Sequence, residues 1–533
     1  MKIAIVGCAH GKLDQIYDNL KRDHRNEKID LVICCGDFQA ARNESDLQCM
    51  AVPPKYRSMG SFYKYYSGEK QAPVLTLFIG GNHEASNFMQ ELPYGGWVAP
   101  KIYYMGYAAV IRVGPLRIGG LSGIHKPFDF DKGHHERAPY EEGSLRSVYH
   151  IRNIEVFRLK QVSGVMDIML SHDWPQEVYN SGCIKTLLMN KPYFKREVDA
   201  NTLGNKPCKE LLDHLKPNYW FAAHLHTKFS ALVDHKCKEN PGENRKTAFL
   251  ALDKCLPRRK YHEIIDIPSD ENNSEIELYY DLEWLTILHL TDHLMSSRKS
   301  TNSMPNSTSS GERWMFTPTE DEKNFVLLRM NNDLKIPLNF ERTARCYEYN
   351  RNSRSKPDPP KAIPNPQTEI FCRKLGIRDP IGGFENMNLS SYENSQFSTP
   401  EKANFSSFIS FSDSPRESSG ASMSSQNDGS TEETGGDDSS QNERSFENSI
   451  NDVNNSFSSA DYFSFIDNPS LSNRPASTPV IQNKRKYDFP SYKEPDNEDS
   501  ADSTPSLLPI QIDRAGNTSL IKRRNANIYQ EED

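Results

Sequence analysis

The chain has 533 residues, enough for two or three compact domains, and its charge is unevenly divided: residues 1–260 carry 37 Lys and Arg against 28 Asp and Glu, whereas residues 261–533 carry 27 against 44. The basic front half suits a polyanionic partner such as nucleic acid, although many solvated surfaces carry a similar excess. The apolar run after Met1 is too short for a signal peptide, nothing approaches a transmembrane helix in length, and ten cysteines lack disulfide-framework spacing, so we expect reduced thiols in the cytosol or nucleus.

Short apolar runs alternate with helical and loop segments over the first 235 residues. The candidate strands are 2–7, 30–36, 73–81, 108–114, 116–123, 167–172 and 219–224. Apolar residues at helical spacing predict helices over 13–24 and 149–162. Strand–helix alternation followed by hairpin-like pairs predicts an α/β protein whose sheets pack face to face.

The next part of the chain, from about 234 to 378, keeps some order. TAFLALDKCLPRRKYHEIIDI (247–267) predicts two strands around a basic turn, and EIELYYDLEWLTILHLTDHL (275–294) predicts a helix. The Ser-, Asn- and Thr-rich stretch 296–312 is expected to be an internal loop.

The composition changes beyond about residue 379. Residues 401–480 include 22 serines and few aliphatic residues, too little apolar surface to offset the entropy of ordering, which predicts disorder. Four Ser/Thr-Pro sites and two short basic runs suggest phosphorylation and nuclear import, and a plain polar tail is the alternative. These features are Thr399, Ser414, Thr478, Thr504, Lys484–Lys486 and Lys522–Arg524.

Five of the predicted strands run into a polar cluster at their carboxyl ends: GCAHG, GDFQ, GNHE, SHDWP and AHLHT. In open α/β sheets, ligands bind outside these strand ends, where several loops converge. A single histidine at a strand end is more often a hydrogen-bonded structural residue than a ligand, but five such clusters favour a shared site. The candidate donors are Cys8, His10, Asp37, Asn82, His83, His172, His224 and His226.

These donors are more numerous than one metal ion needs. Structural zinc takes four Cys or His in paired short spacings, whereas this set has a single cysteine and comes from five strands. A two-metal site, which stabilises the attacking and leaving oxygens of a phosphoryl displacement, fits better. Asp37 is the carboxylate placed to bridge the two cations.

The motifs GCAHG, GDFQ, GNHE, SHDWP and HLH, in this order, resemble the calcineurin-like metallophosphoesterases. The stretches YYSGEK, APVLTLFIGGNHEASN, LPYGGWVAP, SHDWP and FLALDKCLPRR are further similar to the RNA lariat debranching enzymes, nearly continuously over 1–260 and more loosely to 378. The resemblance implies an α/β fold, a calcineurin-like metallophosphoesterase β-sandwich flanked by helices, with a smaller C-terminal domain and a disordered tail. We expect the catalytic domain over 1–233, the C-terminal domain over 234–378 and the tail over 379–533.

The family's site residues carry over by motif position. The matches to the ligands of one metal pocket are Cys8, His10, Asp37 and His226. The matches to the ligands of the other pocket are Asp37, Asn82, His172 and His224. His83 matches the catalytic histidine, which protonates the leaving oxygen as a general acid.

Cys8 stands where the wider superfamily has an aspartate, and the debranching enzymes share this departure. A thiolate in place of a carboxylate favours softer ions such as Zn²⁺ or Fe²⁺ over Mg²⁺. The cofactors implied are one or two divalent metals per active site, Fe²⁺ and Zn²⁺, with Mn²⁺ as the alternative.

The resemblance implies hydrolysis of the 2′–5′ phosphodiester at the branch point of excised intron lariat RNA, by a metal-bound hydroxide with His83 as general acid. The product would be linear RNA for turnover and processing. The stretch from about Ser122 to Arg152 matches the family's lariat-recognition loop. The alternative is that parts of this stretch are only a packing insertion. A second candidate for RNA contact is YYSGEK, residues 65–70.

The expected partners are branched intron lariat RNA and, through the tail, splicing or RNA-turnover proteins, with no membrane. The expected location is the nucleus, and the protein could also shuttle to the cytoplasm. Two alternatives stay open at this point. One is a broader phosphodiesterase or phosphatase of the same superfamily, and the other is a metal-free scaffold, which would predict eroded ligands.

Overall fold

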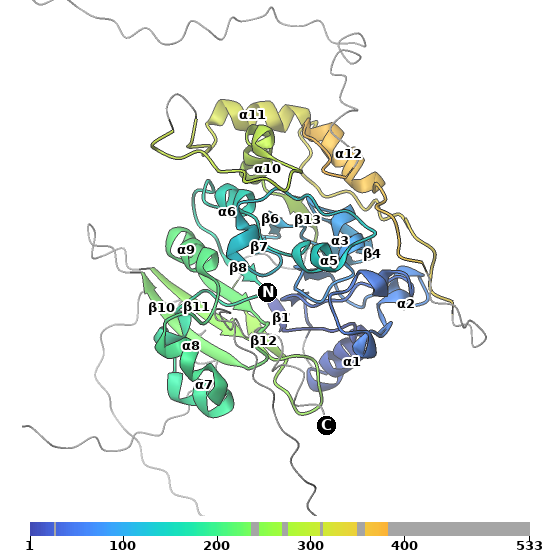
Figure 1. The fold of residues 1–533 in the computed structure, drawn as a ribbon, viewed down its shortest axis with the longest axis vertical. Coiled ribbons are helices and arrows are strands. Elements are labelled where there is room, and N and C mark those ends of the chain that lie inside the picture. Colours follow the sequence, from blue (N-terminus) through green and yellow to red (C-terminus); the bar gives the residue numbers. More distant parts are fainter. Residues whose placement is uncertain (26–27, 236–244, 269–275, 310–312, 349–357, 382–533) are drawn as a thin grey trace, which may run out of the picture. The chain divides into compact units, whose positions relative to one another are not determined.

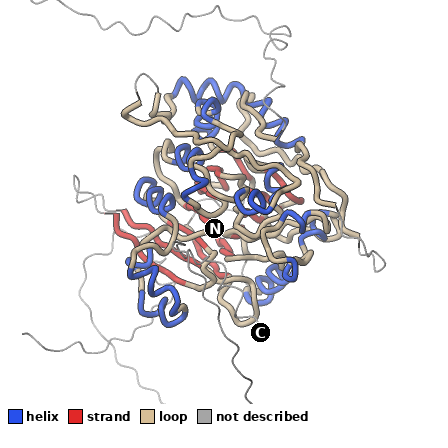
Figure 2. The backbone as a smooth tube through the Cα atoms, in the orientation of Figure 1, coloured by secondary structure: helices blue, strands red, loops and turns tan. Residues whose placement is uncertain are grey.

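Two β-sheets packed face to face form the centre of the computed structural model, which describes residues 1–25, 28–235, 245–268, 276–309, 313–348 and 358–381 (Figure 1). Helices and long loops cover the outer faces of the sheets, as the tube in Figure 2 shows. The α/β prediction with paired sheets is therefore confirmed. The predicted disordered tail lies outside the described residues except for 379–381, which the structure describes.

The first sheet has six strands in the order β12-β1-β2-β3-β5-β4. Their bounds are β1 Lys2–Val6, β2 Leu31–Cys34, β3 Thr76–Phe78, β4 Gly96–Ala99, β5 Ile102–Tyr104 and β12 His262–Asp266. The four strands β1, β2, β3 and β5 run parallel, and the antiparallel strands β12 and β4 close the two edges. The sequence did not predict β4 or β5, which are short, whereas the pair of strands predicted around the basic turn is confirmed as β11 and β12.

The second sheet has seven strands in the order β10-β11-β9-β8-β7-β6-β13. Their bounds are β6 Ala108–Val113, β7 Leu116–Leu121, β8 Ile168–Ser171, β9 Tyr219–Ala222, β10 Phe229–His235, β11 Arg245–Ala251 and β13 Leu278–Tyr280. The central strands β7, β8, β9 and β11 are parallel, and β6 forms the predicted hairpin with β7. Strand β10 was not predicted.

The two sheets bury their facing side chains in one shared apolar cluster. Ile5 and Ile33 of the first sheet lie in it with Ile118 and Phe221 of the second. Side chains alternate across a strand, so the neighbouring residue Val6 points to the opposite face, where it packs among residues of α1. Full burial of one such aliphatic side chain contributes about 1.5–3 kcal/mol relative to an exposed one, which makes this period-2 pattern the main reason for the sandwich.

The helices fill the outer layers. Helix α1 over Leu13–Asp23 confirms the first predicted helix and buries its apolar stripe against the first sheet. The second predicted helix is shorter than expected, with α6 over Asn153–Leu159. The other helices of this region are α2 Phe62–Tyr66, α3 Ser86–Glu91, α4 Pro127–Phe130, α5 Glu142–Ser147, α7 Ile184–Asn190, α8 Lys195–Asp199 and α9 Lys206–Leu215, with 3₁₀ turns at Asp46–Cys49, Pro54–Tyr56, Val178–Ser181 and Pro192–Phe194.

The segment predicted as one helix over 275–294 is divided in the structure. Leu278–Tyr280 forms β13, which pairs with β6, and the helix α10 covers only Leu282–Leu290. Asp281 separates the two elements because its side chain caps α10 by accepting a hydrogen bond from the Trp284 N–H. The prediction of a single helix is therefore wrong.

Helices α11 over Glu320–Arg329 and α12 over Pro366–Leu375 follow, and Figure 1 shows them beside α10, away from α1. A 3₁₀ turn spans Asp292–Leu294, and the described part of the predicted loop 296–312 contains no helix or strand, as expected. Among the described residues, no helix has both the length and the apolar character needed to cross a lipid bilayer.

Candidate metal centre

The predicted donors lie at the carboxyl ends of five parallel strands. Cys8 and His10 follow β1, Asp37 follows β2, and Asn82 and His83 follow β3 of the first sheet. In the second sheet, His172 follows β8, and the last two histidines follow β9. Because the facing sheets present these strand ends to the same region, residues far apart in sequence meet there.

Four donors come together on one side of the centre. One ligand atom of each lies within 4.8 Å of the others, and the set is Cys8, His10, Asp37 and His226. All are buried except the half-buried His10. Sulfur, imidazole nitrogen and carboxylate oxygen in this number are donors suited to a divalent transition metal.

The remaining predicted ligands lie on the other side of Asp37. Its Oδ1 is 3.4 Å from Nε2 of His172, while its Oδ2 is 3.9 Å from Nε2 of His10. Nε2 of His172 is also 3.2 Å from Oδ1 of Asn82, and the rings of His172 and His224 have centroids 4.9 Å apart. The two carboxylate oxygens of Asp37 therefore face two different donor sets.

The backbone around the centre holds unusual conformations. Four donor residues have φ between +46° and +59°, a left-handed conformation that costs residues other than glycine about 1–3 kcal/mol. It persists where the surrounding structure fixes it. The four are His10, Asp37, His224 and His226. Gly36 meets a steric requirement instead, because a Cβ there would collide with the imidazole of His172. Positive φ also occurs at residues outside the centre, such as Lys101 and Asn331, so the observation that bears on function is that four of the donors share it.

The charges of the centre are set by burial and by Asp37. Burial opposes ionisation of Asp37, but the neighbouring His172 and His83 still hold the pKa of this carboxyl well below its ordinary value. Burial lowers the pKa of His10 to about 3, so its imidazole is neutral at pH 7. Burial, with the charge of Asp37, raises the pKa of the Cys8 thiol. A cation bound here would displace that proton and be held by a thiolate, as metal sites require.

Two hydrogen-bonding observations show that a metal ion fits these residues. Nε2 of His10 is buried, and no described residue hydrogen-bonds to it, although a buried imidazole nitrogen normally has a partner. His172 donates from Nδ1 to the Cys35 carbonyl oxygen at 2.8 Å, which leaves Nε2 to face Asp37 and Asn82. That arrangement is the one found for metal-binding histidines, whose second nitrogen is fixed by an outer hydrogen bond.

Two supporting residues were quoted in the motifs but given no role in the sequence analysis. The Gln39 amide lies 2.9 Å from Nδ1 of His10 and so orients that ring. The buried Glu84 carboxylate accepts hydrogen bonds from the backbone N–H groups of Phe38, Gln39 and Gly81, and thereby ties the loop after β2 to the loop after β3. Burial, followed by the charge of Asp37, raises the pKa of Glu84 to about 8. Their positions next to predicted ligands were the only sequence signal.

Cys8→Asp is expected to give a folded protein with a changed metal preference. A carboxylate oxygen is a harder donor than a thiolate, so relative affinity should move by about tenfold or more from Zn²⁺ and Fe²⁺ towards Mn²⁺ and Mg²⁺. The measurement is competitive metal loading followed by elemental analysis. Cys35→Ala, which removes a neighbouring buried thiol outside the donor set, should leave the preference unchanged. An unchanged preference in Cys8→Asp would remove Cys8 from the ligand set.

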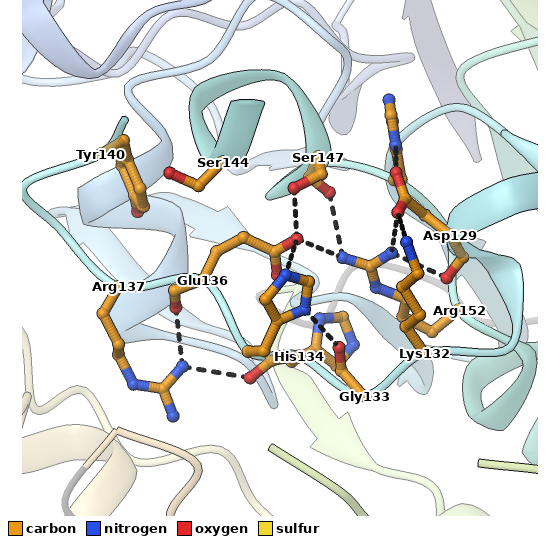
Figure 3. Close-up of polar contacts among 12 residues, drawn as sticks. Asp129, Lys132, Gly133, His134, Glu136, Arg137, Tyr140, Ser144, Ser147 and Arg152 are labelled. Carbon is orange, nitrogen blue, oxygen red and sulfur yellow. Dashed lines mark hydrogen bonds and ion pairs between the residues drawn. The ribbon is translucent and has the colours of Figure 1, made fainter. Parts of the chain in front are cut away.

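The 122–152 loop lies beside Asn82 and His83 and is bonded to the loop after β3. The Gly123 N–H donates to the Gly80 carbonyl oxygen at 2.8 Å, and the Gly80 N–H donates to Oγ of Ser122 at 2.9 Å. The sequence suggested an RNA-contacting loop, with a packing insertion as the alternative. The structure has two short helices here, α4 and α5, and a buried polar network (Figure 3).

Arg152 is at the centre of that network and is fully buried. It donates to the Glu136 carboxylate at 2.6 Å and to the Asp129 carbonyl oxygen at 2.8 Å (Figure 3). The Asp129 carboxylate in turn lies 2.7 Å from Nδ1 of His150 and accepts from Lys132 at 2.8 Å. Much of the charge in this loop therefore holds the loop together, and it is not free to contact RNA. Phe128 is 69% exposed, and the exposed Arg146 lies 3.1 Å from the Glu142 carboxylate.

The second candidate for RNA contact, residues 65–70, is also largely structural. Tyr65, Lys64 and Lys70 all contact the Asp14 carboxylate, at 2.8, 2.9 and 2.8 Å. This cluster fixes α2 against α1 rather than presenting free cations.

Comparison with known proteins gives the same reading of the chain. The family model described as calcineurin-like phosphoesterase matches residues 1–228, and the one described as lariat debranching enzyme, C-terminal domain, matches residues 244–380. The chain is 53% identical over 382 residues to lariat debranching enzyme A of Xenopus laevis, which covers 71% of each protein. It is 53% identical over 384 residues to the lariat debranching enzyme of Homo sapiens, a match that covers 71% of this chain and 70% of the human protein. It is 45% identical over 380 residues to the lariat debranching enzyme of Arabidopsis thaliana, which covers 71% of this chain and 86% of the plant protein. With its donors gathered at the strand ends and relatives at this level of identity, the chain belongs to the lariat debranching enzyme family of metallophosphoesterases.

Proposed function

We propose that this protein hydrolyses the 2′–5′ phosphodiester at the branch point of intron lariat RNA and releases linear RNA. The observation that carries the proposal is the complete donor set around Asp37, on a chain whose relatives are named for debranching. A scaffold that had lost catalysis would not need these strained, buried donors. The presence of competent donors at all the predicted positions argues against that alternative.

His83 is the residue we assign to proton donation. Its backbone N–H donates to Oδ1 of Asp37 at 2.8 Å, and its Nδ1 lies 3.4 Å from Oδ2 of the same carboxylate. With Nδ1 beside Asp37, the opposite nitrogen, Nε2, is the atom that would give a proton to the leaving 2′ oxygen of the branch nucleotide. The residue is 6% exposed, so bulk water has little access to it.

The metal ions implied by the fold would be held by the donors on the two sides of Asp37. When bound, divalent cations offset the phosphate charge and lower the pKa of water towards neutrality. The single soft donor, Cys8, supports Zn²⁺ and Fe²⁺ over Mg²⁺, with Mn²⁺ as an alternative. Elemental analysis of protein purified without oxygen tests this assignment, since air oxidises a ferrous ion.

The tail and the cellular location are part of the same proposal. Residues beyond 381 carry Ser/Thr-Pro sites and short basic runs, which support regulation by phosphorylation, contacts with splicing or RNA-turnover proteins, and a nuclear location. Fluorescent tagging of the full chain and of a variant with Lys522–Arg524 changed to alanine tests the location.

A comparison of two substrates tests the function. The full-length protein is incubated with a branched RNA and with a linear 3′–5′ RNA of the same sequence, and the products are separated by size. We expect cleavage at the 2′–5′ bond alone. Equal cleavage of both RNAs would favour a broader phosphodiesterase, and no cleavage of the branched RNA would refute debranching.

The 122–152 loop is held in place by the C-terminal part of the chain, which gives a further prediction. The Gly133 N–H donates to the Arg298 carbonyl oxygen at 3.0 Å, the His134 N–H donates to the Ser296 carbonyl oxygen at 3.0 Å, and the Asn302 N–H donates to the Asp131 carbonyl oxygen. A Cβ on Gly133 would collide with the backbone at Ser296. Gly133→Ala should therefore separate the loop from this support.

For Gly133→Ala we expect a loss of about 1–3 kcal/mol in the free energy of unfolding, the usual cost of overpacking. Hydrogen exchange should rise in residues 122–152 and 296–302, and KM for branched RNA should rise more than kcat falls. Gly143→Ala is the matched control, because a Cβ there meets nothing within 4 Å. Equal exchange in both variants would mean that the C-terminal segment does not support the loop.

A further inference from the structure

The connection between β11 and β12 forms a second rim of the metal centre. It begins beside Cys8, whose carbonyl oxygen accepts a hydrogen bond from the Cys255 N–H at 2.9 Å, and it closes where the Asp253 N–H donates to the Lys260 carbonyl oxygen at 3.1 Å. The next residue, Tyr261, accepts from the Gly7 N–H at 2.8 Å. Residues 254–260, which we call the basic loop, therefore project past the carboxyl end of β1, where Cys8 and His10 lie.

The basic loop carries four cations within seven residues, in the sequence KCLPRRK. Arg258, Arg259 and Lys260 are exposed, and Lys254 is half-buried. Arg259 lies 3.5 Å from the Asp253 carboxylate. The side chains of Arg258 and Lys260 form no ion pair or hydrogen bond with any residue that the structure describes. Their charge is thus not balanced within the described protein.

The basic loop begins directly beside the metal centre. Lys254 forms an isolated bridge with Cys8 along the backbone. Lys12, which is half-buried, follows two residues after His10. The rim beside Cys8 and His10 therefore carries several basic side chains.

The 122–152 loop borders the opposite side of the centre, next to Asn82 and His83. A branch nucleotide joins three RNA arms, whereas a linear phosphodiester joins two, so a branched substrate needs phosphate contacts on more than one side of the reacting bond. Much of the charge of the 122–152 loop is paired within the loop itself. In the basic loop, Arg258 and Lys260 are exposed and have no side-chain partner among the residues that the structure describes.

We infer that the basic loop binds the backbone phosphates of one RNA arm of the branched substrate, with Arg258 and Lys260 as the contacting side chains. This inference rests on the proposed debranching function. Arginine and lysine on an exposed turn contact phosphates without reading bases, so the contact should add affinity and leave base preference unchanged. It should affect substrate binding and not the chemical step.

The test is the double variant Arg258→Ala/Lys260→Ala in the full chain, assayed on branched RNA over a range of salt concentrations. Loss of two phosphate contacts should raise KM roughly tenfold at low salt, keep kcat within about twofold, and make the plot of log(kcat/KM) against log salt shallower by about 1.4. Arg258→Lys/Lys260→Arg keeps both charges and should retain the wild-type slope.

Arg373→Ala/Lys374→Ala on α12 is the matched control, since it too removes two cations from a short stretch, on a helix that Figure 1 shows away from α1 and β12. It should leave KM and the salt slope unchanged. An unchanged or lowered KM in the basic-loop variant, with normal wild-type debranching, would overturn the inference but not the function. Wild-type protein that fails to debranch would refute the function itself.

Discussion

His83→Ala is expected to lose debranching activity by roughly 10²–10⁴-fold, the usual contribution of a general acid, while the protein keeps its metal ions. The reason is the position of His83 beside the donors but outside the cluster of four that lie within 4.8 Å of one another. Its Nδ1 lies 3.4 Å from Oδ2 of Asp37, so loss of the ring should remove the proton donor and leave the four clustered donors in place. Activity is measured on branched RNA, and metal content by elemental analysis.

A second substrate sharpens this result. A branched RNA whose leaving oxygen is replaced by sulfur needs no protonation, so His83→Ala should cleave it far closer to the wild-type rate. His235→Ala is the control, because His235 is a buried histidine of β10 that hydrogen-bonds to Thr247, outside the centre. Loss of metal from His83→Ala would contradict our assignment and make His83 a ligand.

The site could be predicted from the sequence because its signal is local. Each donor lies at or just past the end of a short apolar run, usually beside Gly, Ser or Ala, and such a run marks a strand end without knowledge of the fold. Cys8, Asp37 and His172 could therefore be proposed as neighbours although 164 positions separate the first from the last. What the sequence could not provide was their arrangement. The division of the donors between the two oxygens of Asp37 depends on how the two sheets face each other.

The predictions that failed depend on long-range contacts. The run 275–294 is apolar enough for one helix, but Asp281 also accepts hydrogen bonds from Arg117 at 2.9 Å, and this buried pairing places the preceding residues on the edge of β6. In the 122–152 loop the RNA contact suggested by its His, Lys, Arg and Tyr residues stays a prediction. The sequence did not show which charges of the loop are paired, such as Arg152, which donates to Glu136 across 15 intervening residues. Composition shows that charges are present and not which of them are already paired.

Asp37→Asn is expected to have the largest effect on metal binding. The substitution keeps the size and shape of the side chain, so the fold should survive, but it removes the negative charge and replaces one acceptor oxygen with an NH₂ donor. Because the two oxygens of Asp37 face His10 on one side and His172 on the other, both donor sets lose their shared anion. Metal content should fall below one ion per chain, and debranching should fall by at least about 10³-fold, as when a catalytic unit is removed.

Asp173→Asn is the matched control, because Asp173 is an equally buried carboxylate one residue past His172 that caps the Trp174 N–H at 2.9 Å. It should keep both its metal content and most of its activity, which would show that the effect belongs to the position of Asp37 and not to the loss of any buried carboxylate. Loss of one ion with retention of the other in Asp37→Asn would mean that a single donor set holds its metal without the shared carboxylate. Because Asp37 is shared by the two donor sets, its loss removes a ligand from both, so we expect the two pockets to empty together.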